Sequence, residues 1–126
     1  MTAQWKIIRL ELARTPGFPE GSASHAYVLR LPLNDNGLID DAAVTFHPDL
    51  ATVRRTWPDE SDQQGYVVRK PNGWAFSYAL GDDDDEGVFH LESHPLALGD
   101  YLTLTEPDGK RLPFRVVSLH PDGALV

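Results

Sequence analysis

Apolar and polar residues alternate along most of the chain, as in strands that bury one face. In residues 5–12, Ile8, Leu10 and Leu12 alternate with Arg9 and Glu11. Successive side chains of a strand point to opposite faces of a sheet, so a two-residue period buries one face and exposes the other. This pattern recurs at residues 26–33, 65–70, 73–80, 87–92, 100–106 and 111–119. It predicts about seven strands.

Turn-forming residues separate these segments. Residues 13–25 concentrate Gly, Pro and Ser and predict a long loop, and NDNG at 34–37 ends the strand before it. PNG at 71–73 and PDG at 107–109 lie between apolar segments, where Asn and Gly tolerate the positive φ of tight turns. Strands joined by such short turns predict a mainly β fold, either a small antiparallel barrel or a strongly bent sheet. A β-sandwich is the alternative.

One segment has the period of a helix instead. Four apolar residues recur there at intervals of three and four positions: Phe46, Leu50, Val53 and Trp57. Pro48 suits the first position of a helix, and Pro58 prevents the helix from continuing. The spacing predicts one short α-helix over residues 48–57, which closes one end of the barrel or covers an edge.

Length and composition indicate one globular domain over residues 1–126. The chain is 41% apolar and 24% charged, and one hydrophobic core suffices at this size. The absence of cysteine excludes disulfides, thiolate catalysis and sulfur-ligated metals. No segment has the roughly 20 consecutive apolar residues of a membrane span, and residues 1–12 do not read as a secretory signal. We expect a cytoplasmic protein with no membrane association.

The net charge of −8 is concentrated in the second half of the chain. Residues 1–58 hold six basic and six acidic residues, whereas residues 59–126 hold five basic and thirteen acidic ones. Phosphate backbones attract clustered Lys and Arg, so this balance argues against general binding to nucleic acid. It favours a basic partner.

An acidic run at residues 81–87 (GDDDDEG) is the candidate metal site. Hard cations such as Ca²⁺ or Mg²⁺ prefer clustered oxygen ligands, and imidazoles nearby extend the choice to Zn²⁺ or Mn²⁺. The candidate ligands are Asp82, Asp84, Glu86, His90 and His94. Five like charges between strands more often form a solvated hairpin tip, which is the competing interpretation, and nothing indicates another cofactor.

The lack of catalytic motifs favours a protein that is not an enzyme. Ser22, Ser24 and His25 lie close together in sequence, but a nucleophile elbow, a phosphate-binding glycine loop and a dinucleotide fingerprint are all missing. The aromatic residues could line a ligand cavity or fill the core. They are Trp5, Tyr66, Trp74, Phe76, Tyr78, Phe89 and Tyr101.

Two resemblances add to this reading. HPLALGDYLTL at 94–104, with DG at 108–109 and FRVV at 114–117, resembles the Gly-Asp entry into a strand of PUA-like barrels. That resemblance implies RNA or modified-nucleotide binding on a concave basic face, formed here by Arg69, Lys70, Lys110, Arg111 and Arg115. Residues 16–33, 73–86, 89–101 and 105–116 together resemble a family of small uncharacterised bacterial proteins, which implies no activity.

Three hypotheses for the function remain open. The favoured one is a non-enzymatic binding module that engages a protein or peptide partner, preferably basic, through a sheet edge or its acidic C-terminal half. The alternative is a barrel that binds a small molecule or a divalent metal near residues 82–86, His90 and His94. The second alternative is a PUA-like RNA-binding domain.

Overall fold

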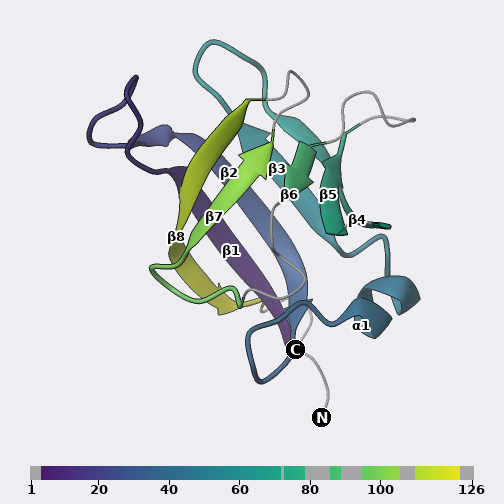
Figure 1. Ribbon diagram of the computed structural model, residues 1–126. Coiled ribbons are helices and arrows are strands. Elements are labelled where there is room, and N and C mark those ends of the chain that lie inside the picture. Colours follow the sequence, from purple (N-terminus) through teal and green to yellow (C-terminus); the bar gives the residue numbers. More distant parts are fainter. Residues whose placement is uncertain (1–3, 72, 79–85, 89–94, 106–109, 123–126) are drawn as a thin grey trace.

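The computed structural model describes residues 4–71, 73–78, 86–88, 95–105 and 110–122, and the protein is mainly β as the alternation predicts (Figure 1). Within these residues it has eight strands and one short helix, in the order β1 (Gln4–Leu12), β2 (Ser22–Leu33), α1 (Asp41–Phe46), β3 (Thr52–Thr56), β4 (Gln63–Lys70), β5 (Gly73–Ser77), β6 (Glu86–Val88), β7 (Tyr101–Thr105) and β8 (Arg111–Pro121).

The strands form a closed antiparallel barrel. Each strand pairs with the strands before and after it in sequence, and β8 returns to pair with β1. The pairing between β1 and β2 runs from Gln4↔Leu33 to Leu12↔Ser22, and β1 pairs with β8 from Lys6↔Pro121 to Leu12↔Phe114. The barrel is therefore confirmed and the β-sandwich is not formed.

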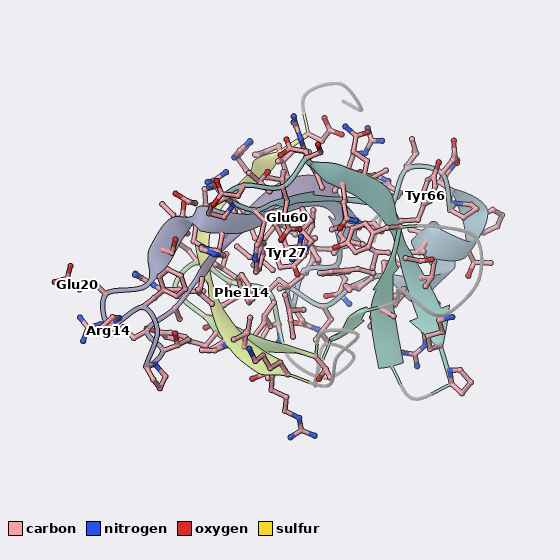
Figure 2. The ribbon with its side chains drawn as sticks, turned by 90° about the horizontal axis from the view of Figure 1, so that it is seen from above. Arg14, Glu20, Tyr27, Glu60, Tyr66 and Phe114 are labelled. Atoms are coloured by element: carbon pink, nitrogen blue, oxygen red, sulfur yellow. The ribbon has the colours of Figure 1, made fainter. Side chains whose placement is uncertain are left out.

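The inward face of the barrel is the face that the alternation selects. Ile8, Leu10 and Leu12 of β1 are buried, while Arg9 and Glu11 between them are partly exposed. Aromatic rings fill the middle of the interior: Tyr27 lies 5.3 Å from Phe76 and 5.0 Å from Phe114, between ring centroids. Figure 2 shows Tyr27 and Phe114 inside the barrel. One hydrophobic core thus occupies its centre.

The prediction of a helix over residues 48–57 is wrong. The helix lies upstream at Asp41–Phe46, and Thr52–Thr56 forms β3 between β2 and β4. Asp40 caps the helix, because its Oδ1 accepts a hydrogen bond from the Ala43 N–H at 3.1 Å. Pro48 follows the helix and stops it, since proline disfavours a helical conformation in the residue before it. β-Branched residues at 52, 53 and 56 favour the strand.

Several turns agree with the sequence. Lys70 pairs with Gly73, which has φ of 137°, so a hairpin joins β4 to β5. Asn34 Oδ1 accepts hydrogen bonds from the N–H groups of Asn36 and Leu38 in the turn after β2. The predicted loop at 13–25 is shorter, because β2 already begins at Ser22. Residues 79–80, 89–92 and 107–109 lie outside the described residues.

Helix α1, at six residues, is too short to cross a lipid bilayer, and the described part of the chain contains no helix that is long and apolar enough to do so.

Candidate functional site

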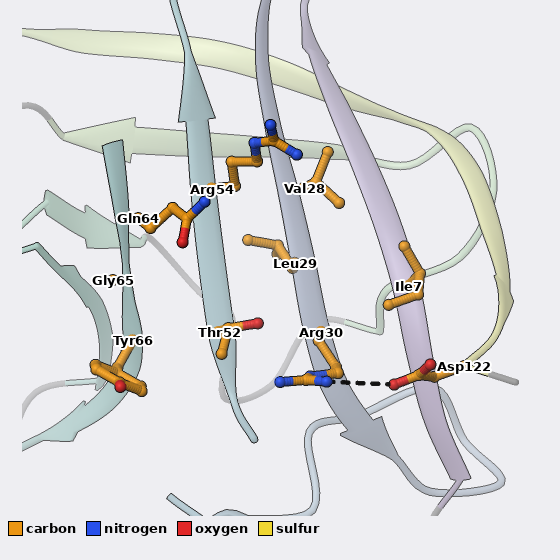
Figure 3. A pocket seen from close by; sticks show the side chains of 10 residues that line it. All are labelled: Ile7, Val28, Leu29, Arg30, Thr52, Arg54, Gln64, Gly65, Tyr66 and Asp122. Atoms are coloured by element: carbon orange, nitrogen blue, oxygen red, sulfur yellow. Dashed lines mark ion pairs between the residues drawn. The ribbon is translucent and has the colours of Figure 1, made fainter. Parts of the chain in front are cut away.

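The outer face of β1–β4 contains a hollow of about 420 Å³ (Figure 3). Strand pairing aligns its residues in two rows. The first row is Ile7, Arg30, Thr52 and Tyr66; the second is Val28, Arg54 and Gln64. The short side chains of Val28 and Thr52 lie between the longer arginine, glutamine and tyrosine side chains. The hollow therefore combines an apolar floor with hydrogen-bonding groups around it.

The charges around this hollow are paired. The Arg30 Nε donates a hydrogen bond to the Leu50 carbonyl at 2.8 Å, and its Nη1 lies 3.7 Å from Asp122 Oδ2. The Asp122 side chain is only 10% exposed, so a positive charge beside it offsets part of the cost of its burial. Arg54 pairs with Asp62 at 3.3 Å on the surface. The four charges cancel, and the hollow does not select a charged ligand by its net charge.

A second concave region, here called the helix groove, lies between α1 and β4. It encloses about 440 Å³ and is lined mainly by apolar side chains. Val44, Thr45, Pro48 and Asp49 line one side, and residues 66–69 of β4 line the other. Tyr66 borders both the groove and the hollow, and it is 50% exposed. These two concave regions therefore meet at one aromatic side chain.

Among the residues that the structure describes, no strand pairs with β4 beyond Val67 on the side of the helix groove, and the edge around Arg69 is here called the open stretch. The pairing of β4 with β3 ends at Thr52↔Tyr66, followed by one more hydrogen bond from the Val67 N–H to the Ala51 carbonyl at 2.9 Å. β4 nevertheless continues to Lys70, paired with β5 on its other side. Backbone groups of alternate residues point to the same side of a strand. The N–H and C=O of Arg69 therefore face the open side, as those of Val67 do.

Two charged residues, Arg69 and Asp49, line the helix groove. Arg69 reaches across it to Asp41, with Nε 3.5 Å from Oδ2, and both side chains are substantially exposed. An exposed pair of this kind contributes little stability. Asp49 also lines the groove, and it forms no ion pair with any residue that the structure describes. The groove thus carries one available negative charge.

A cluster of aromatic rings lies at the N-terminal end of β2, and this region is here called the barrel mouth. The His25 ring centroid lies 4.7 Å from that of Phe18 and 4.7 Å from that of Trp57, with edge-to-face geometry in both pairs. A bulge in β2 aims His25 there: Glu11 pairs with Ala26 and Leu12 with Ser22, so residues 23–25 are extra residues. A cavity of about 460 Å³ opens beside these rings.

His25 also forms a short hydrogen bond within the mouth. Ser22 Oγ lies 2.8 Å from His25 Nδ1, so the pair adjacent in sequence does meet in space. A serine nucleophile would further need an acid to orient the histidine. Among the described residues, no carboxylate is hydrogen-bonded to His25. The geometry is that of a positioned imidazole rather than of a catalytic triad.

Burial lowers the pKa of His25 below the ordinary value of 6.5, and the positive charge of Arg55 lowers it further; Glu60 acts in the opposite direction. Arg55 lies over the Trp57 ring at 3.9 Å and pairs with Glu60 at 2.9 Å. Desolvation disfavours the charged form of an imidazole, and so does a neighbouring cation. His25 is therefore neutral at neutral pH.

This lowered pKa predicts a loss of stability in mild acid. As the pH decreases, the unfolded chain binds the His25 proton before the folded chain does. The contribution of neutral His25 to the free energy of unfolding is therefore fully present above pH 6.5, and it falls as the pH decreases from there toward the lower pKa of the folded state. We expect His25→Gln to make the free energy of unfolding less dependent on pH between 7 and 5. Urea unfolding at several pH values measures this. Parallel pH profiles for the two proteins would contradict it.

The candidate metal site lies outside the described residues. This holds for Asp82, Asp84, His90 and His94, and for the side chain of Glu86, whose backbone belongs to β6. Among the side chains that the structure describes, no three His, Asp or Glu residues are grouped in a way that could hold a metal ion. The metal site therefore stays a prediction from the sequence.

The basic face expected for RNA binding is not formed by its five residues. Arg69 and Lys70 belong to β4, whereas Arg111 and Arg115 belong to β8, and Lys110 directly precedes it. Three strands separate β4 from β8 in either direction around the closed barrel. The residues of β4 and those at β8 therefore lie on opposite sides of the barrel, and they cannot form one continuous face.

The sequence carried only weak signals for the groups that the structure brings together. Tyr66 was a candidate cavity residue, but nothing local showed that β3 would leave β4 directly after it. The mouth combines Phe18 from a loop, His25 from a bulge and Trp57 from the position directly after β3. A comparison of the chain with protein-family models, with curated proteins and with solved structures finds no match in any of the three.

Proposed function

We propose that the protein is a non-enzymatic binding module that takes an extended apolar peptide segment of a partner protein along the open stretch of β4. The observation that carries this proposal is that β4 continues to Lys70 after β3 has left it at Thr52. Unpaired backbone groups at the edge of a sheet are a template for another strand.

The backbone and the helix groove supply complementary parts of the interaction. An added strand would hydrogen-bond to the N–H and C=O of Arg69, and strand addition obtains affinity from such main-chain bonds. Alternate side chains of the peptide would enter the groove beside Val44 and Val68. Aromatic residues are enriched at protein interfaces, and Tyr66 borders this edge with half of its surface exposed. The open stretch is short, so we expect weak and transient binding.

Charge indicates the kind of peptide. Asp49 lines the groove without an ion pair to any described residue, whereas Arg69 is already paired with Asp41. A basic residue next to the apolar one would therefore meet Asp49, and the net charge of −8 would attract a basic partner from a distance. The favoured partner is an extended peptide in which apolar residues alternate with Lys or Arg.

Selection from a random heptapeptide display library, followed by titration of the enriched synthetic peptide into ¹⁵N-labelled protein, tests this proposal. We expect enriched sequences with alternating apolar residues and at least one Lys or Arg. The amide signals of Val68, Arg69 and Lys70 should shift on titration. N-methylation of the central peptide residues should weaken binding by about tenfold or more, because an unsatisfied backbone group costs about 1–3 kcal/mol.

Matched variants test the location. Tyr66→Ala should weaken the enriched peptide about tenfold, as truncation of a well-placed interface aromatic does. Tyr101→Ala, at a residue of β7 that is similarly exposed, should leave the affinity unchanged. The proposal fails if no peptide is enriched, if the N-methylated peptide binds equally well, or if the two tyrosine variants behave alike.

A further inference from the structure

We propose that the barrel mouth is a second binding site, for a planar aromatic small molecule. The site is formed by Phe18, His25 and Trp57 and their cavity of about 460 Å³. This volume lies within the range of about 300–1,000 Å³ that is typical of small-molecule pockets. The inference does not depend on the peptide site, which lies at β4 and α1.

The aromatic wall of the mouth is held in place before any ligand binds. Trp57 is covered by Arg55, and its ring centroid lies 5.8 Å from that of Tyr27 and 6.1 Å from that of Phe114. Tyr27 and Phe114 are themselves fully buried. A wall fixed by the core loses little side-chain freedom on binding, which favours affinity.

Phe18 is held in place by backbone hydrogen bonds, although the residue is 38% exposed. Its N–H donates to the Thr15 carbonyl at 2.9 Å, and its own carbonyl accepts from the N–H groups of Thr15 at 3.0 Å and Gly21 at 2.9 Å. Figure 2 shows Arg14 and Glu20, which flank this segment, at the far end of the molecule from Tyr66. An exposed ring on a fixed backbone offers a surface on which a flat ligand can stack.

His25 supplies a polar group inside this aromatic setting. Its Nδ1 is engaged by Ser22, and among the described residues Nε2 has no hydrogen-bonding partner. A neutral imidazole has one donor and one acceptor nitrogen, so Nε2 can bond to one polar group of a ligand. Apolar walls with few polar groups are typical of ligand pockets. The chemical class that fits is a flat, mainly apolar ring system with one hydroxyl or ring nitrogen.

The test compares 2-naphthol with decahydro-2-naphthol, which has the same carbon skeleton and hydroxyl but no aromatic rings. Both are titrated into the ¹⁵N-labelled full chain at pH 7.5. We expect 2-naphthol to bind saturably and at least about twofold more tightly, since ring stacking adds about 0.5–1.5 kcal/mol beyond burial of area, which corresponds to about two- to twelvefold in affinity. The shifted amide signals should be those of residues 15, 17, 18, 25 and 57.

Phe18→Leu is the matched variant, because it keeps an apolar side chain and removes the ring. We expect it to weaken the binding of 2-naphthol at least about twofold, for the same stacking reason, and to leave the binding of decahydro-2-naphthol almost unchanged. Tyr66→Ala, which affects the peptide site, should change neither. The proposal is overturned if 2-naphthol shows no saturable binding up to its solubility, if the two compounds bind equally, or if Phe18→Leu has no effect.

Discussion

Replacing Phe114 with alanine is expected to lower the free energy of unfolding by about 3–5 kcal/mol, the usual cost of truncating a buried phenylalanine. Phe114 is 0% exposed, and its ring packs against those of Tyr27 and Trp57. The alanine variant would have a cavity in the centre of the barrel. The cavity could not collapse easily, because β8 pairs with β1 on one side and β7 on the other.

Urea unfolding followed by circular dichroism measures this loss. Phe46→Ala is the control, because Phe46 at the end of α1 is 82% exposed and its truncation should change the stability by less than about 0.5 kcal/mol. A loss below about 1 kcal/mol for Phe114→Ala would contradict the closed, packed interior, since a filled barrel interior cannot lose a ring at so little cost.

The strands were predictable wherever one face of the alternation is fully apolar. In β1, every inward residue from Ile8 to Leu12 is buried, and a shift of one residue would expose all of them. The register with β2 and β8 is therefore determined by the sequence itself. The same holds for Leu102 and Leu104 of β7, which are buried between partly or fully exposed neighbours.

The helix could not be placed correctly because two periods fit the same residues. Leu50, Val53 and Trp57 satisfy a helical spacing, but Ala51 and Val53, both buried, also satisfy the two-residue period of a strand. Residues 52–56 form a strand rather than a helix because they pair with β2 on one side and with β4 on the other. Pairing with two strands outweighs the weak local preference, and such a long-range effect is invisible in a local pattern.

The candidate sites depend even more on long-range geometry. The open stretch of β4 exists because the chain turns away at residues 47–50, just before β3. In the mouth, the close pair Ser22 and His25 was visible in the sequence, but the rings on both sides of His25 were not. Their side chains meet only after the barrel has closed. Sequence therefore predicted the scaffold better than the surfaces that it carries.

Replacing Gly65 with alanine is expected to destabilise the protein by about 2 kcal/mol or more, within or above the range of about 1–3 kcal/mol typical of overpacking. A Cβ at this position would overlap the Ser77 carbonyl oxygen, and it would lie 2.8 Å from the Ser77 carbonyl carbon and 2.9 Å from Tyr78 Cα. All three atoms belong to the backbone, so no side-chain rotation relieves the overlap. β4 or the chain after β5 must move instead.

Gly17→Ala is the matched control, because a Cβ there meets nothing within 4 Å. We expect it to unfold at nearly the wild-type urea concentration, and Gly65→Ala to unfold at a clearly lower one. Gly65 is adjacent to Tyr66 and lines the outer hollow, so a shift of β4 would also displace the proposed peptide edge and weaken peptide binding. Equal stability and equal peptide binding of Gly65→Ala and Gly17→Ala would contradict this prediction. They would mean that β4 lies farther from residues 77–78 and that the open stretch has a different position.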